Sequence, residues 1–126
     1  MAKKKKGKGK VVSEPVNVKS RFNNVKVLIQ TERTKEAIAY IYLTYSDLVR
    51  EKLGKPRMAH QTIREYAITC VNELKQKPEN VYSFVKAIED IIYGGVEPTQ
   101  KEINSTASLF GTLYNEITGE TFTFAV

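Results

Sequence analysis

The chain has 126 residues, of which 41% are hydrophobic and 27% are charged, close to the averages of globular proteins. This length fits one domain, the single cysteine excludes an intrachain disulfide, and no apolar run approaches the roughly 20 residues that a membrane-spanning helix requires. The formal net charge of +6 belongs to the first ten residues, because the basic and acidic residues that follow them balance.

Residues 1–20 are predicted to form a flexible lysine-rich tail, and residues 21–126 a single helical domain. Lysines separated by glycines repel one another, and the residues around Pro15 show no helical period. Six lysines in this tail are the first candidates for binding an anionic partner: Lys3, Lys4, Lys5, Lys6, Lys8 and Lys10. Such a cluster suits the phosphates of a nucleic acid and an anionic lipid surface equally well.

Residues 24–30 alternate apolar and polar side chains, as a half-buried strand does, with Val25, Val27 and Ile29 on one face. A similar alternation occurs in residues 120–126, where Phe122, Phe124 and Val126 share a face. The sequence therefore allows a short β pairing of these two segments at the ends of the domain.

Four helices are predicted between these segments, because apolar residues recur there with a period of 3.6. They are expected from Thr31 or Thr34 to about 53, from 62 to about 77, from 78 to the stop at Gly94 and Gly95, and from 99 to just before Gly119. Short connections between such helices favour a mainly α fold, a compact bundle of about four helices.

Two of the helix starts share one signature, a threonine placed three residues before a glutamate. Thr62 precedes Glu65, and Thr99 precedes Glu102, which is the spacing of a capping box. In this arrangement the threonine hydroxyl and the glutamate carboxylate each accept an N–H group that would otherwise lack a partner. Gly94 is expected at the end of the third helix, within a glycine pair that forms the cap and turn.

Few residues suit catalysis. The only histidine, His60, lies in a polar linker, and Cys70 lies in the apolar stripe of the second predicted helix. A dyad of these two residues stays open, but a buried structural cysteine is the favoured interpretation. Glu89 and Asp90 are adjacent on a helix and point about 100° apart, which indicates a solvated edge. One histidine and one cysteine cannot form the usual metal cluster, so no catalytic residue, cofactor or small-molecule substrate is predicted.

A second basic group follows the first predicted helix and comprises Arg50, Lys52, Lys55 and Arg57. Tyrosines beside it would stack on nucleic-acid bases if they were exposed. Most of the seven tyrosines lie at helical spacing among aliphatic residues, so core positions are favoured, with Tyr40 or Tyr42 expected to project outward.

Charge is also divided along the body. Residues 11–77 contain 12 basic and 7 acidic residues, whereas residues 78–126 contain 2 basic and 7 acidic residues. The two halves could present opposite electrostatic fields to a partner. Neutralisation across the contacts between helices is the favoured alternative.

The order of Thr62-x-Arg64-Glu65-Tyr66-Ala67, Tyr93-Gly94-Gly95, Pro98-Thr99 and Glu102 resembles a C-terminal domain of unknown function. This domain occurs in prokaryotic transglutaminase-like and other membrane proteins, and the likeness covers about residues 35–117. The resemblance implies a small helical module on the cytosolic side of a membrane segment, with no established activity and no catalytic residue to transfer.

The resemblance also suggests a setting for the lysine tail, because lysines cluster just inside membrane-spanning helices. This chain departs from the family pattern in lacking such a helix, either as a soluble variant or as a piece that begins beyond one. The leading expectation is a non-catalytic interaction module, cytoplasmic and at the inner face of the membrane, with an unknown protein partner. The alternative is a nucleic-acid or ribosome-associated protein that uses the same tail and the segment 50–57.

Overall fold

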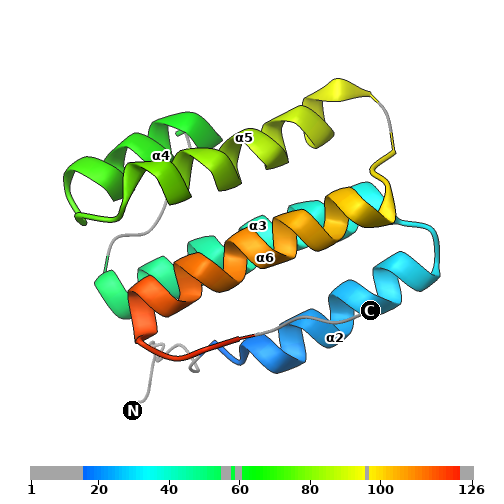
Figure 1. Ribbon diagram of the computed structural model, residues 1–126, viewed down its shortest axis with the longest axis horizontal. Coiled ribbons are helices and arrows are strands. Elements are labelled where there is room, and N and C mark those ends of the chain that lie inside the picture. Colours follow the sequence, from blue (N-terminus) through cyan, green and yellow to red (C-terminus); the bar gives the residue numbers. More distant parts are fainter. Residues whose placement is uncertain (1–15, 55–57, 59–60, 96, 123–126) are drawn as a thin grey trace, which may run out of the picture.

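The described part of the chain consists of five α-helices and their connections. The computed structural model describes residues 16–54, 58, 61–95 and 97–122. The helices are α2 (Val18–Gln30), α3 (Thr34–Leu53), α4 (Ile63–Asn72), α5 (Pro78–Gly94) and α6 (Gln100–Thr118). The predicted helical bundle is therefore confirmed (Figure 1).

The predicted β pairing is wrong, because residues 24–30 belong to helix α2 and no strand occurs in the described ranges. Thr121 and Phe122, at the start of the second alternating segment, are not in a strand, and residues 123–126 lie outside the description. Helix α2 also begins inside the stretch assigned to the tail, at Val18, whereas residues 1–15 are not described.

Helix α2 forms because its sequence contains, in addition to the alternating pattern, apolar residues at helical spacing. The side chain of Asn17 caps the helix by accepting a hydrogen bond from the backbone N–H of Ser20 at 2.9 Å. Val18, Phe22 and Val25 then follow at spacings of four and three residues, and all three are buried. Tertiary packing against this stripe, rather than strand propensity, determines the structure of the segment.

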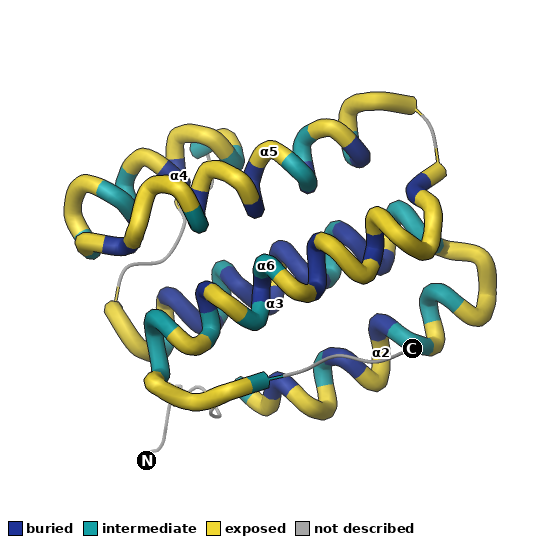
Figure 2. The backbone as a smooth tube through the Cα atoms, viewed as in Figure 1, coloured by how far each residue is buried: buried dark blue, intermediate teal, exposed yellow. Residues whose placement is uncertain are grey.

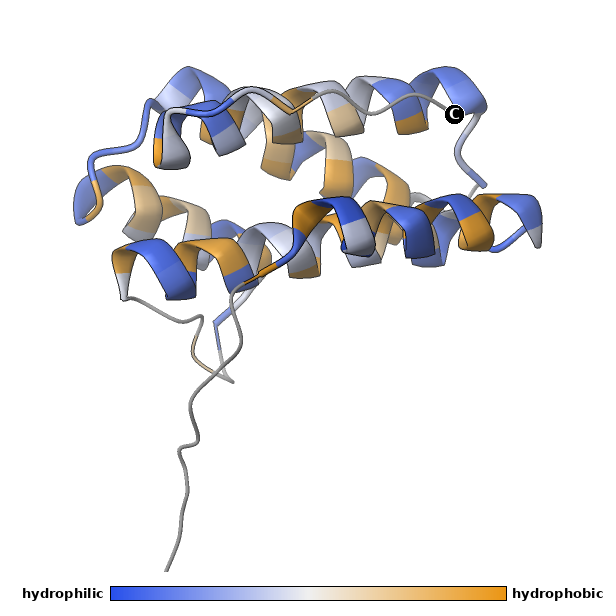
Figure 3. Cartoon of the chain, turned by 90° about the horizontal axis from the view of Figure 1, so that it is seen from below, coloured by the Kyte–Doolittle hydropathy of each residue, from blue (hydrophilic) through white to orange (hydrophobic). Residues whose placement is uncertain are grey.

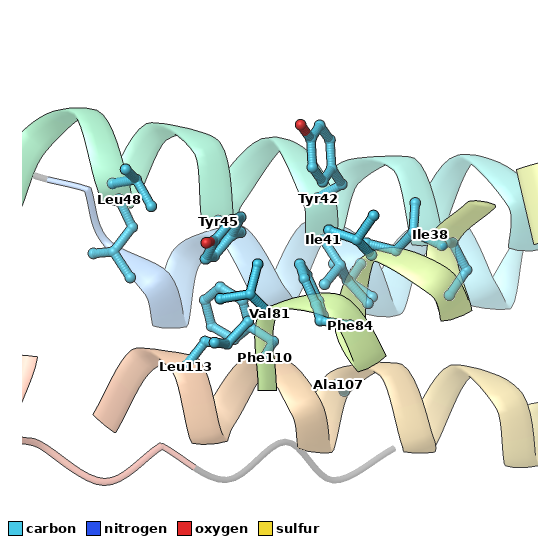
Figure 4. Close-up of a cluster of buried hydrophobic side chains, with 14 of the residues drawn as sticks. Ile38, Ile41, Tyr42, Tyr45, Leu48, Val81, Phe84, Ala107, Phe110 and Leu113 are labelled. Atoms are coloured by element: carbon cyan, nitrogen blue, oxygen red, sulfur yellow. The ribbon is translucent and has the colours of Figure 1, made fainter. Parts of the chain in front are cut away.

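The helices are arranged in layers around a central pair. Helices α3 and α6 lie side by side, α4 and α5 cover one side of them, and α2 covers the other side against α3 (Figure 1). The side chains between the layers are buried, while the outer faces are exposed (Figure 2). The centre of the core joins α3, α5 and α6 (Figure 4), and its largest fully buried side chains include Ile38, Ile41, Tyr45, Leu48, Phe84, Phe110 and Leu113.

Local capping chemistry sets the helix starts, as predicted. Thr62 accepts the N–H of Glu65 at 3.0 Å, and the Glu65 carboxylate accepts the N–H of Thr62 at 2.9 Å. The second box is also complete, because Thr99 accepts the N–H of Glu102 at 3.1 Å and Glu102 accepts the N–H of Thr99 at 2.8 Å. These bonds satisfy donors that a helix start leaves without partners.

Two helix ends differ from the sequence expectation. Gly94 is the last residue of α5, and the left-handed cap residue is its neighbour Gly95, with φ of 74°. Helix α4 ends at Asn72, about five residues earlier than expected, because the chain turns at Lys75, whose φ is 63°. This turn directs the side chain of Gln76 into the core, where it is 6% exposed.

Candidate functional site

Of the two residues considered for a catalytic dyad, the structure describes only Cys70. Cys70 is fully buried, as the favoured interpretation predicted, while His60 lies outside the described residues. Burial raises the pKa of the Cys70 thiol, so little of the nucleophilic thiolate forms near neutral pH. No group of three potential metal ligands occurs in the part of the chain that the structure describes.

The adjacent carboxylates of α5 form ion pairs with two different residues. Glu89 accepts a charge-assisted hydrogen bond from Arg64 of α4 at 2.6 Å, and Asp90 pairs with Lys86 at 3.1 Å. The two acids therefore form separate pairs. Asp90 is exposed, as the predicted solvated edge requires, whereas the side chain of Glu89 is only 19% exposed. The Arg64–Glu89 pair also joins the basic and acidic halves of the body, so it is one instance of neutralisation across a helix contact.

The core contains a polar cluster that the sequence patterns do not predict. The hydroxyl of Tyr45, on α3, donates to the side-chain carbonyl of Gln76 at 2.7 Å, and both residues are buried. Burial is the largest cause that raises the pKa of Tyr45 and of Tyr66, and neighbouring Cys70 adds to both shifts. Because Gln76 occupies a short polar connection, nothing in its local sequence distinguishes it from an exposed loop residue.

The exposure of the tyrosines corrects one expectation. Tyr42 is buried at 6% exposure and does not project outward, whereas Tyr40 is half-buried at the surface between α2 and α3. The exposed tyrosines are Tyr82 and Tyr93, both on α5. Neither lies on α3, the helix that carries Arg50 and Lys52.

The structure describes two of the ten predicted anion-binding residues. Arg50 and Lys52 lie in the last turn of α3, where Arg50 is 3.5 Å from Asp47 and Lys52 is 3.7 Å from Glu51. The remaining eight lie outside the described residues: Lys3, Lys4, Lys5, Lys6, Lys8, Lys10, Lys55 and Arg57.

The point at which the N-terminal segment joins the bundle is close to these cations. The backbone N–H of Val16, the first described residue, donates to the Glu51 carboxylate at 2.5 Å. Lys10 is six residues before Val16, which limits their separation to about 22 Å even in a fully extended chain. The first described residue therefore lies beside the end of α3 that carries Arg50 and Lys52.

Helix α2 continues the basic character of the N-terminus. Its 13 residues include Lys19, Arg21 and Lys26 and no acidic residue. Arg21 forms an ion pair with Asp47 of α3 at 2.9 Å and lies over the ring of Tyr40, 6.0 Å from its centroid. The first 31 residues of the chain contain nine basic residues and a single acidic one. The charge pattern therefore unites the N-terminal segment with α2.

An apolar groove of about 460 Å³ lies at the surface between α2 and α3. At its edges Val27 is 54% exposed and Leu43 is 52% exposed, which are large values for aliphatic side chains. One wall is held in place by the amide of Asn24, which donates to the hydroxyl of Tyr40 at 2.9 Å. The groove is lined by Asn24, Val27, Leu28, Glu36, Ala39, Tyr40 and Leu43.

The groove and the basic helix share one side of the molecule. Figure 3 views the molecule from the side on which α2 lies in Figure 1, and hydrophilic and hydrophobic residues are interspersed along the helices. None of the described helices combines the length and hydropathy needed to cross a membrane. The arrangement can therefore attract anions through α2 and offer apolar contact through Val27 and Leu43.

Comparison with known proteins leaves the family resemblance as a prediction. No family model, curated protein or solved structure matches this chain.

Proposed function

We propose that this chain is a non-catalytic helical interaction module that binds an anionic lipid surface through its N-terminal lysines and the side formed by α2 and α3. One observation supports this proposal above the others. Helix α2, which has three cations and no acid, directly follows the lysine-rich segment and borders a groove with exposed Val27 and Leu43. In this proposal the module works on the cytoplasmic side of the membrane and presents its remaining surface to a protein partner.

The combination of cationic and apolar groups favours lipid over nucleic acid as the partner. Each lysine or arginine close to an anionic leaflet contributes about 1 kcal/mol of attraction. Exposed aliphatic side chains add binding energy when they enter the boundary between headgroups and acyl chains. Nucleic-acid phosphates attract only the cationic side chains. The exposure of Val27 and Leu43 therefore has no role in that alternative.

Tryptophan fluorescence can test which side of the molecule meets the lipid, because the chain contains no natural tryptophan. We expect Leu43→Trp to shift to shorter wavelength on phosphatidylcholine vesicles that contain phosphatidylserine, and to be quenched by brominated acyl chains. Ile68→Trp is the matched control, because Ile68 is 44% exposed on α4, across the central helices from α2. Equal responses of the two reporters would argue against docking through the α2–α3 side.

The contribution of the lysines is tested separately by vesicle sedimentation. Replacing all six tail lysines by glutamine should abolish most of the binding and weaken its dependence on salt, because the cations of α2 remain. Equal recovery of the two proteins on anionic vesicles would contradict attachment through the tail. An RNA or DNA titration at low salt completes the test, since tight nucleic-acid binding without vesicle binding would support the alternative partner.

A further inference from the structure

The groove between α2 and α3 is elongated along the two helices. Because a short turn at residues 31–33 joins these helices, they run antiparallel (Figure 1). The lining residues extend from Asn24 to Leu28 on α2 and from Glu36 to Leu43 on α3. The α3 wall corresponds to about 10 Å at the helical rise, so the groove follows the helix axes for about this length.

The polar side chains of the lining already interact with other residues of the protein. The amide of Asn24 donates to the hydroxyl of Tyr40 at 2.9 Å, and the carboxylate of Glu36 lies 3.8 Å from Arg33. The remaining lining side chains are aliphatic: Val27, Leu28, Ala39 and Leu43. A ligand in this groove therefore gains mainly from apolar contact, and a hydrocarbon chain does so without leaving polar groups unpaired.

The size of the groove favours a slender ligand. Its volume of about 460 Å³ lies toward the lower end of the range of ligand sites, which is about 300–1,000 Å³. Ala39 is the smallest lining residue and is half-buried, while Val27 and Leu43 at the edges are 54% and 52% exposed. An elongated apolar groove of this size suits one acyl chain better than a bulky or compact ligand.

One end of the groove carries excess positive charge. Arg21 lies one helical turn before Asn24 on α2, and its guanidinium is 6.0 Å from the ring centroid of the lining residue Tyr40. Asp47 is 2.9 Å from Arg21 and 3.5 Å from Arg50, so two guanidinium groups share one carboxylate. The contact between Arg21 and Asp47 uses Nη1, and a guanidinium has other N–H donors in a planar fork that matches a carboxylate.

The other end of the groove, beside the turn between the helices, lacks this excess. There Glu36 of the lining lies beside Arg33, one acid with one base. A carboxylate near this end would repel an anionic ligand, whereas the arginines at the opposite end attract one. The charges therefore give the groove a direction, with an anionic head favoured beside Arg21 and a tail extending toward Leu28.

We infer that the groove between α2 and α3 binds a fatty-acid anion, with the acyl chain along the aliphatic lining and the carboxylate beside Arg21. The inference rests on the proposed function, in which lipid meets this side of the molecule, and it names the lipid and the part of it that the groove receives. Apolar contact with Val27, Ala39 and Leu43 supplies the affinity. The guanidinium of Arg21 sets the preference for an anionic head.

Calorimetric titration of the full chain with monomeric dodecanoate, without vesicles, tests the groove itself. Ala39→Leu places a larger side chain in the groove and should weaken dodecanoate binding by roughly tenfold, since each excluded methylene costs about fourfold in affinity. Ala87→Leu is the matched control, because Ala87 is also half-buried on a helix but lies on α5, away from the groove. Melting curves establish that both variants are folded, and equal dodecanoate affinities for the two would overturn the inference.

The head-group preference is tested with a second pair of variants. Arg21→Gln should weaken dodecanoate binding several-fold, whereas Arg64→Gln should not, although both arginines pair with an acid on a neighbouring helix. Dodecyltrimethylammonium, which has the same tail and a cationic head, should bind the natural chain more weakly than dodecanoate. Equal affinity for the two amphiphiles would overturn the assignment of the carboxylate to Arg21.

Vesicle sedimentation of the same proteins separates this inference from the proposed function. If the natural chain sediments with phosphatidylserine vesicles but does not bind dodecanoate, the groove assignment fails and lipid attachment stands. If the chain binds dodecanoate with the predicted dependence on Ala39 and Arg21 but does not sediment, the groove assignment is supported and attachment to a lipid surface fails. Loss of both signals would contradict both.

Discussion

The buried hydrogen bond between Tyr45 and Gln76 allows a quantitative prediction. Tyr45→Phe removes a hydroxyl from a fully buried ring and leaves the Gln76 carbonyl without its donor at 2.7 Å. The side-chain amide of Gln76 already has no hydrogen-bond partner within the described residues. The substitution would therefore leave an entire carboxamide buried and unpartnered, and an unsatisfied buried polar group costs about 1–3 kcal/mol.

We expect Tyr45→Phe to reduce the free energy of unfolding by about 2 kcal/mol, which for a domain of about 100 residues lowers the melting temperature by about 10 °C. Gln76→Met should be destabilising for the converse reason, because it leaves the Tyr45 hydroxyl buried without its acceptor. The double variant replaces both polar partners by apolar groups, so it should be more stable than the sum of the single effects predicts.

Urea denaturation followed by circular dichroism measures all four proteins in one double-mutant cycle. A coupling energy of about 1 kcal/mol or more in the expected direction supports the reasoning. Strict additivity of the two substitutions, or an unchanged stability of Tyr45→Phe, would refute the argument that this bond compensates for burying Gln76.

Three further predictions follow from the caps and the buried acids. Thr62→Ala and Thr99→Ala should each cost about 1 kcal/mol, measured by urea denaturation, because each removes one capping box, and unchanged stability in both would contradict the observed bonds. Cys70 should react with a thiol reagent only after unfolding, because it is buried and its thiol pKa is raised, so rapid labelling of the native protein would count against its core position. Stability should fall above about pH 9. Burial raises the pKa values of three groups in the folded protein, so they ionise at their ordinary pKa values only in the unfolded chain: Tyr45, Tyr66 and Cys70. Urea midpoints that stay constant from pH 8 to 11 would contradict this prediction.

Features set by neighbouring residues could be predicted from the sequence. The capping boxes at Thr62 and Thr99 and the apolar periods of α3, α5 and α6 depend on residues within one or two helical turns. The segment of α2 was misassigned because Val25, Val27 and Ile29 alternate while Val18, Phe22 and Val25 follow a helical spacing. A short apolar run is compatible with both periods, and only packing against α3 selects one.

The candidate lipid-binding surface depends on the same tertiary choice. As a strand, residues 24–30 would have placed Val27 on the buried face with Val25, whereas the helix buries Val25 and leaves Val27 at the edge of the groove. Leu43 is exposed for a related reason, because α2 covers α3 only in part. The positions of these two residues follow from helix packing across the chain, which local sequence patterns do not determine.

The placement of α2 outside the central layers has a consequence for hydrogen exchange. Helix α2 packs mainly along α3 and reaches α6 through the ring of Phe22, 5.1 Å from that of Phe110, while α5 contacts α3, α4 and α6. A helix held on one side can detach without disrupting the rest of the core, so its backbone amides should exchange through a partial opening at a lower free energy than global unfolding. Helix α2 would thus open at a lower free energy than the central helices α3 and α6.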